Sequence, residues 1–218
     1  MSTAPFLGQA RELPKEKLLS EDRLLEVLEE THRTLEAGGI RYGLIGGVAS
    51  SVLGRPRTTR DIDLFVKPCD AERVLAALEA RGFECERTDH KWIFKAFKHG
   101  VQVDIIFLTG RGIYFDGELV ERCRAVTFAG VDVWVVAPED LFVIKAVAHD
   151  EATPRHWHDA LGLLLKSDFD WDYLLQRSRF GQRRVLSLLL YAQSLDYAVP
   201  DRVICELWRH IFQNVRET

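Results

Sequence analysis

Three aspartates have the type and spacing that metal-dependent chemistry requires. Asp61 and Asp63 lie within the apolar run Asp61–Val66, and Asp104 lies within a second apolar run, Val101–Leu108. Because side chains alternate between the two faces of a strand, Asp61 and Asp63 are expected to point the same way. Two like charges side by side destabilise a strand unless a cation or solvent compensates them. Carboxylates are the ligands that Mg²⁺ prefers, so this pair predicts a metal site.

A pair of glycines precedes the acids and extends this interpretation. Gly46 and Gly47 follow a short apolar strand, Tyr42–Ile45, and precede a predicted helix, Val48–Leu53. Backbone N–H groups at a helix N-terminus bind phosphate, and glycine permits the close approach that a side chain would block. Metal-binding carboxylates beside a phosphate-binding turn predict transfer of a nucleotidyl group. An Asp-x-Asp pair alone is also common as a solvated strand end, so the order of glycines, acid pair and third acid carries the prediction.

The segment Leu44–Val66 closely resembles the signature of the nucleotidyltransferase superfamily that includes DNA polymerase beta. The positions that match the pattern GGxA...RxTxDxDL are Gly46, Gly47, Ala49, Arg57, Thr59, Asp61, Asp63 and Leu64. This version is similar to the branch that contains bacterial enzymes of toxin–antitoxin and abortive-infection systems. The resemblance covers about residues 42–165. It implies Mg²⁺-dependent transfer of NMP from an NTP with release of pyrophosphate, with two metal ions held by Asp61, Asp63 and Asp104.

The resemblance also suggests which residues bind the nucleotide. Many family members carry a serine at the position of Gly47, so here a phosphate-binding hydroxyl is expected from Ser50 or Ser51, or is absent. The predicted nucleotide-binding residues are Gly46, Gly47, Ser50, Ser51, Arg57, Thr59, Arg60 and Lys145. Among these, Arg60 (like Arg55) is equally compatible with a solvated basic loop. Lys145 lies on the apolar side of a predicted helix, where a lysine usually extends to water. In related enzymes, however, a lysine that follows a similar Pro-Glu-Asp-Leu helix start is directed at the nucleotide.

Residues further along the chain have a less certain connection to the site. By its resemblance to an R-x-x-D segment of this branch, Asp159 is expected to orient Arg155 or Lys145, or to line the cleft. The nearby His156 and His158 lie on different faces of a predicted helix, so they are interpreted as polar surface residues. Trp92 and Phe94 are interpreted as residues that pack the sheet.

Hydrophobic patterning predicts an α+β fold in which a mixed β-sheet flanked by helices is followed by an all-helical C-terminal half. Residues 1–137 are predicted to form the catalytic domain, with 1–17 as a loose lead-in and a first helix capped at Ser20. Residues 138–218 are predicted to form a helical domain that begins at Pro138.

The composition limits the class of protein. A formal net charge of -4 gives no overall attraction for nucleic acid, and four scattered cysteines without a CxxC motif indicate reduced thiols in the cytoplasm. No apolar run reaches the length of a membrane span. The acceptor is left open between tRNA, a protein such as a cognate toxin, and a small hydroxylated molecule. A catalytically silent nucleotidyltransferase-like binding or antitoxin protein is the alternative.

Overall fold

The computed structural model describes residues 15–213 and the side chains from residue 21 onward. Residues 1–14 of the predicted lead-in and the last residues, 214–218, lie outside this range. The helices are α1 (Lys15–Ala37), α2 (Gly46–Leu53), α3 (Ala71–Glu79), α4 (Gly117–Arg122), α5 (Pro138–Ala148), α6 (Arg155–Lys166), α7 (Trp171–Arg177), α8 (Gln182–Ser194) and α9 (Asp201–Phe212). The strands are β1 (Tyr42–Leu44), β2 (Asp61–Val66), β3 (Glu84–Asp89), β4 (Ile93–Lys98), β5 (Val101–Ile106), β6 (Arg124–Phe128) and β7 (Val131–Val135).

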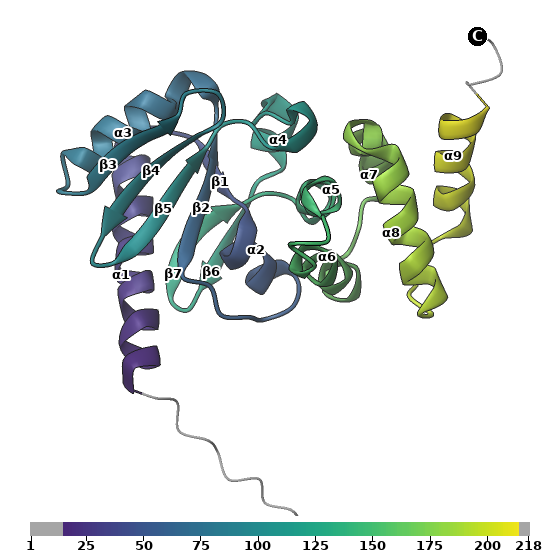
Figure 1. Ribbon diagram of the computed structural model, residues 1–218, viewed down its shortest axis with the longest axis horizontal. Coiled ribbons are helices and arrows are strands. Elements are labelled where there is room, and N and C mark those ends of the chain that lie inside the picture. The colour runs from purple at the N-terminus through teal and green to yellow at the C-terminus, as the bar shows by residue number, and fades with distance from the viewer. Residues whose placement is uncertain (1–14, 214–218) are drawn as a thin grey trace, which may run out of the picture.

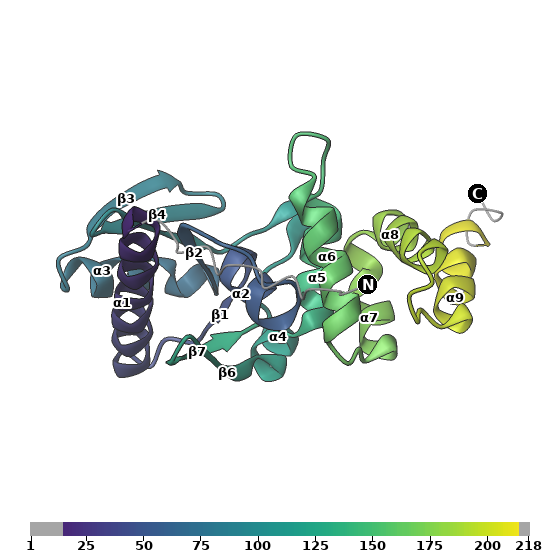
Figure 2. The same cartoon turned by 90° about the horizontal axis from the view of Figure 1, so that it is seen from below.

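The strands in the described part form one mixed sheet with the order β3-β4-β5-β2-β1-β7-β6. Helices α1 and α3 cover one face of this sheet, and α5 to α9 extend from one end of it (Figures 1 and 2). The predicted α+β class, with a helical C-terminal part, is confirmed. The change from strands to helices occurs between β7 and Pro138. That this change separates two domains stays a prediction.

The central strand β2 follows the alternation that its sequence predicts. Ile62 and Leu64 are fully buried, while Asp61 and Asp63 on the opposite face are only partly buried. Strand β2 pairs in parallel with β5 on one side and antiparallel with β1 on the other. The apolar face of β2 therefore packs into the core and its acidic face is left for the site.

Two elements differ from the prediction. Helix α1 begins at Lys15, so neither the lead-in to residue 17 nor the helix start at Ser20 is correct. Strand β3 was not predicted, because its sequence Glu84–Asp89 is polar and mostly exposed. It pairs only with β4 at the edge of the sheet, where backbone hydrogen bonds rather than apolar burial hold a strand in place.

The helical part is attached to the sheet by a buried arginine. Arg177 in α7 is 1% exposed and forms ion pairs with Asp140 Oδ1 at 2.7 Å, Asp116 Oδ2 at 2.9 Å and Glu118 Oε2 at 3.0 Å. Tyr173 donates a hydrogen bond to Asp140 at 2.8 Å. A buried guanidinium needs several acceptors to offset its lost hydration, so these acids fix α7 against α4 and α5. None of the helices in the described part is long and apolar enough to cross a membrane.

Candidate active site

The parallel pairing of β2 and β5 brings the three aspartates together. Asp63 lies directly opposite Asp104, and Asp61 lies two positions away on the same face. One carboxylate oxygen from each residue falls within 4.8 Å of the others. The strand of Asp104 therefore lies beside that of Asp61, as a shared metal site requires. Three hard oxygen ligands at this spacing fit a divalent cation such as Mg²⁺.

The electrostatics of the cluster favour a cation. Burial, together with the charges of Asp61 and Asp104, raises the pKa of Asp63 to about 6. The carboxylate is therefore less stable in the folded protein than in water, because it has lost hydration and lies beside two like charges. A bound divalent cation would reverse this effect by supplying the missing positive charge.

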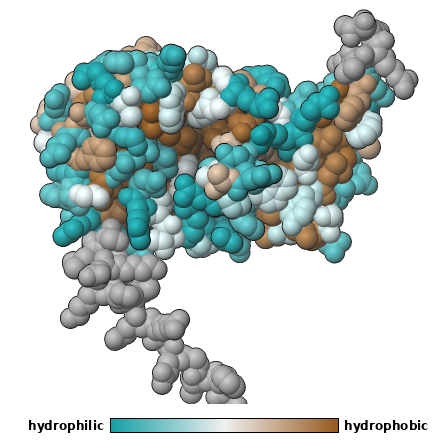
Figure 3. Space-filling view, viewed as in Figure 1, coloured by the Kyte–Doolittle hydropathy of each residue, from teal (hydrophilic) through white to brown (hydrophobic). Residues whose placement is uncertain are grey.

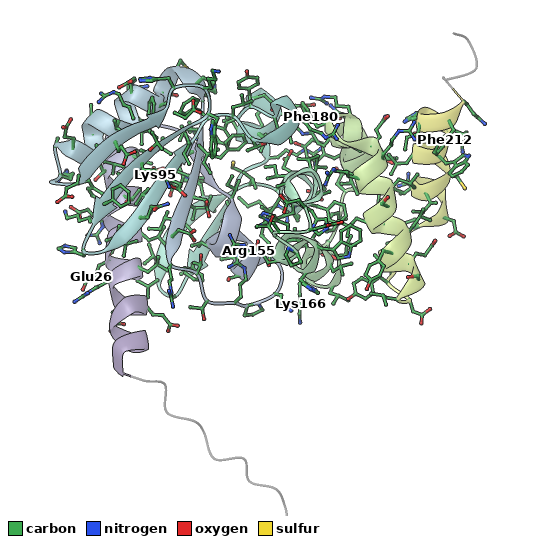
Figure 4. The ribbon with its side chains drawn as sticks, in the orientation of Figure 1. Glu26, Lys95, Arg155, Lys166, Phe180 and Phe212 are labelled. Carbon is green, nitrogen blue, oxygen red and sulfur yellow. The ribbon has the colours of Figure 1, made fainter. Side chains whose placement is uncertain are left out.

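Asp104 differs from the other two acids in having a cationic ion-pair partner among the described residues. Lys95 lies opposite it on β4, and its ammonium contacts Asp104 Oδ1 at 3.1 Å. Gln102 donates a hydrogen bond to the same oxygen at 2.8 Å. Figure 4 shows Lys95 on the face of the sheet, within the strand next to β5. Both partners bind Oδ1, so they orient the carboxylate and leave Oδ2 without a hydrogen bond among the described residues. Neither partner is predicted from the sequence.

Gly46 is required by the close approach of α2 to the acids. Its φ of +62° lies in the left-handed region that glycine adopts without strain. A Cβ at this position would lie 1.8 Å from Asp63 Oδ2, which no side chain can accommodate. The Gly47 amide donates to the same oxygen at 3.4 Å. The N-terminus of α2 is therefore directed at the acid cluster, and phosphate binding there stays a prediction.

The position of Thr59 leaves no room for a side chain at Gly47. A Cβ on Gly47 would lie 2.2 Å from Thr59 Oγ1 and 2.6 Å from Thr59 Cβ. The threonine hydroxyl thus occupies the space beside the helix N-terminus, where it donates to Asp61 Oδ1 at 2.6 Å. The chain therefore has a hydroxyl at this place, but it comes from the loop before β2.

Ser50 and Ser51 do not supply that hydroxyl. Ser50 is fully buried and donates to the Gly46 carbonyl at 2.6 Å. Ser51 donates to the Arg57 carbonyl at 2.9 Å and accepts from the Arg57 amide at 3.3 Å. These bonds hold α2 and the following loop in place. Neither serine lines the cavity beside the acids, so this part of the prediction is not supported by the geometry.

A polar cavity of about 620 Å³ adjoins the acids and is large enough for a nucleotide. Its cationic lining residues are Arg57, Arg60, Lys145 and Arg155. Figure 4 shows Arg155 near α2, between the sheet and the helical part. The predicted residues Gly46, Gly47, Thr59, Asp61 and Asp63 also line this cavity. Arg55 and Asp104 are not among its lining residues.

Asp159 anchors two of these cations. Its carboxylate contacts Lys145 Nζ at 3.0 Å and Arg57 Nε at 3.2 Å, and the side chains of Asp159 and Lys145 are 1% and 3% exposed. Burial lowers the pKa of Lys145, whereas Lys145 and Arg57 outweigh burial and hold the pKa of Asp159 below its usual value. The expected contact of Asp159 with Lys145 is confirmed. The other ion-pair partner of Asp159 among the described residues is Arg57, not Arg155.

A second, apolar cavity of about 520 Å³ meets the first at Gly46, Asp63, Lys145 and His156. Trp92 lines it and is 44% exposed, so the interpretation of Trp92 as a packing residue is wrong, whereas Phe94 is buried as expected. His156 lines both cavities, although helical spacing placed it on the surface. Burial and the nearby Lys145 lower the pKa of His156 to about 4, so it is neutral at pH 7. Figure 3 shows a hollow between the sheet part and the helical part, with hydrophobic residues on its wall.

The contact between Gly47 and Thr59 gives a compensation test. Gly47→Ser is expected to destabilise the protein by about 1–3 kcal/mol, because its Cβ would overlap the Thr59 side chain. Adding Thr59→Ala removes the hydroxyl, which is the nearer of the two overlapping atoms, but keeps the Cβ, so the double variant should recover part of that loss. Urea unfolding of the four proteins measures the coupling. Equal effects of Gly47→Ser with and without Thr59→Ala would contradict this geometry.

Comparison with known proteins places this site in a family. A family model described as "Uncharacterised nucleotidyltransferase" matches residues 11–213. No match is found among curated proteins. An antigenic nucleotidyltransferase-like protein from Paracoccidioides brasiliensis has a similar structure, with a TM-score of 0.55 and 16% identity, covering 88% of this chain and 98% of that one.

The antibiotic-resistance factor ANT(2'')-Ia also shares the fold. Its solution structure gives a TM-score of 0.52 at 18% identity, covering 79% of this chain and 92% of that one. A crystal structure of ANT(2")-Ia in complex with adenylyl-2"-tobramycin gives a TM-score of 0.50 at 17% identity, over 79% and 98%. At these identities the similarity shows the fold alone. The family match spans nearly the whole chain, and this protein belongs to that family of uncharacterised nucleotidyltransferases.

Proposed function

We propose that the protein transfers NMP from an NTP to a hydroxyl group of an acceptor, with Mg²⁺ bound by Asp61, Asp63 and Asp104. The observation that carries this proposal is the single cluster formed by these acids next to a cavity lined by four cationic side chains. Carboxylates suit the metal, and arginine and lysine suit the triphosphate. The metal-binding acids and the cations that suit a triphosphate therefore lie together beside the N-terminus of α2.

The proposed reaction forms one bond and breaks another. The acceptor oxygen attacks the α-phosphorus, and the bond from this phosphorus to the oxygen that bridges to the β-phosphate breaks, so pyrophosphate leaves with the electron pair. Asp104 takes the hydroxyl proton, which suits a carboxylate whose orientation Lys95 and Gln102 fix. When bound, Mg²⁺ would supply charge that neutralises the reacting phosphate.

The chain's own residues bind and orient the triphosphate. Arg57 and Lys145 are fixed by Asp159, so their charges are held in position before the nucleotide binds. Thr59 offers a hydroxyl beside the N-terminus of α2. The exposed Arg60 and Arg155 can close on the outer phosphates. Pyrophosphate would then leave from the side of the arginines.

A catalytically silent binding protein is the alternative, and a cognate toxin or other protein partner belongs to it. Such a protein need not keep a complete metal-binding set, but here all three acids converge. Calorimetric titration with α,β-methylene-ATP and Mg²⁺ tests this choice. Binding that requires Mg²⁺ and is lost in Arg57→Ala supports the enzyme. Absence of binding in the wild-type protein would favour the silent partner.

A further inference from the structure

The apolar cavity next to the acid cluster is lined by none of the arginines assigned to the triphosphate. We infer that it is the acceptor site, and that it takes a compact, largely apolar molecule with a hydroxyl group, uncharged or anionic. This inference rests on the proposed nucleotidyl transfer and specifies its second substrate. Three observations carry it: the position of the cavity relative to the triphosphate, two buried polar atoms without partners, and the charges of the walls.

The two cavities extend in opposite directions from Asp63. The polar cavity is lined by residues 57–61, which lead into β2. The apolar cavity is lined by Ile106 and residues 108–110, at and beyond the end of β5. Because β2 and β5 run parallel with Asp63 opposite Asp104, these segments lie at opposite ends of the strands. Attacking and leaving oxygens must lie roughly in line on opposite sides of the phosphorus. With pyrophosphate on the arginine side, the hydroxyl must arrive from the apolar cavity.

Two residues of the apolar cavity carry polar atoms that lack a partner. Thr109 Oγ1 and His156 Nδ1 are both buried and form no hydrogen bond with any described residue. Burying a polar atom without a partner costs about 1–3 kcal/mol, so such atoms are rare in folded proteins. Both residues line the cavity but these two atoms are covered, so rotation of the side chains would be needed to turn them toward polar groups of a bound ligand. Both atoms are neutral groups at pH 7, so they suit a hydroxyl or carbonyl.

The walls indicate the rest of the acceptor. Trp92, Ile106, Leu108 and Ile144 provide apolar surface, and the half-exposed Trp92 ring can stack against a flat molecule. Among the described residues, Asp63 is the one acid in the lining, and it belongs to the metal cluster. A polycationic aminoglycoside would therefore find no free carboxylate here. The exposed Lys91 adds positive charge at this cavity, which tolerates an anionic substituent.

A binding experiment with 4-methylumbelliferone, a flat molecule with one hydroxyl group, tests the inference. The wild-type protein is expected to bind it in the presence of α,β-methylene-ATP and Mg²⁺, as measured by fluorescence polarisation. Ala148→Phe places a ring in the cavity from an exposed helix position and should weaken probe binding about tenfold or more. Thr109→Val should weaken it several-fold, because it removes the hydroxyl and keeps the shape. The matched control is Ala80→Phe, at an exposed helix end outside both cavities.

The same titrations with α,β-methylene-ATP separate the possible outcomes. Unchanged nucleotide affinity in Ala148→Phe, with probe binding lost, supports the acceptor site. A parallel loss of nucleotide affinity would overturn it, because the cavity would then hold the nucleobase. Displacement of the probe by kanamycin or by total tRNA, or equal probe binding by all variants, would also overturn it. A wild-type protein that binds the probe but no nucleotide would instead refute the proposed function.

Discussion

Asp63→Asn is expected to stabilise the metal-free protein by about 3 kcal/mol at pH 8, although it removes a ligand of the proposed metal site. Burial and the neighbouring Asp61 and Asp104 raise the pKa of Asp63 to about 6 from its ordinary value of 3.8. A pKa that is higher by one in the folded state than in the unfolded chain corresponds to about 1.4 kcal/mol of folding free energy. Asparagine has nearly the same shape without the charge, so the variant avoids this cost.

The pH dependence of this effect has a definite sign. Because the pKa of Asp63 is higher in the folded state, the folded protein holds its proton more tightly than the unfolded chain does. The cost is absent below about pH 4, grows between about pH 4 and 6, and is complete above about pH 6. The difference in the free energy of unfolding between Asp63→Asn and wild type should follow this course in urea titrations.

Added Mg²⁺ should reverse the order of stability. The wild-type protein gains stability when the cation binds the folded state, whereas Asp63→Asn should lose most of this gain. Asp168→Asn, at an exposed position away from the cavities, is the matched control and should behave as wild type. If Asp63→Asn destabilised the protein, or if the stability difference did not change with pH, other groups would already compensate the negative charges of the three acids.

Asp159→Ala is expected to have the largest destabilising effect, about 3–5 kcal/mol. It leaves the Lys145 ammonium, which is 3% exposed, without its carboxylate partner. Lys145→Met in the same protein removes the orphaned charge, so the double variant should recover most of the lost stability. Arg57 is 20% exposed and can reach water, so it adds less to the cost.

A double-mutant cycle from urea unfolding measures this coupling. Lys145→Met alone leaves Asp159 paired with Arg57 and should cost less than Asp159→Ala. Additive effects of the two substitutions would contradict a buried ion pair. The folded Asp159→Asn variant should also bind nucleotide more weakly, since Arg57 and Lys145 would no longer be held toward the polar cavity.

The sequence was sufficient to predict the centre of the fold. Strand β2 coincides with the apolar run at Asp61–Val66, and β5 begins with the apolar run that starts at Val101 and contains Asp104. Apolar periodicity is strong in these segments because they are half-buried. Strand β3 was missed because hydrogen bonding at a sheet edge leaves no apolar pattern.

The remaining features depend on contacts between distant segments. Nothing in the local sequence shows that Thr59 fills the space at Gly47, or that Arg177 is buried among acids from α4 and α5. Helical spacing predicted that His156 lies on the surface. Such spacing cannot show that another part of the chain covers this face of the helix. Trp92 has a strand-like context, yet it lies just before β4 and faces a cavity. Such positions are set by tertiary packing, which one-dimensional periodicity does not encode.

The most direct test of the proposed catalytic centre is transfer of label from an NTP that carries ³²P at its α-phosphorus. The protein is incubated with each labelled NTP, Mg²⁺ and fractionated cell extract as the source of acceptors, and transferred label and released pyrophosphate are both measured. We predict Mg²⁺-dependent transfer by the wild-type protein and none by the variant that combines Asp61→Asn and Asp63→Asn. Equal transfer by both proteins would contradict the assignment of these acids as the catalytic centre.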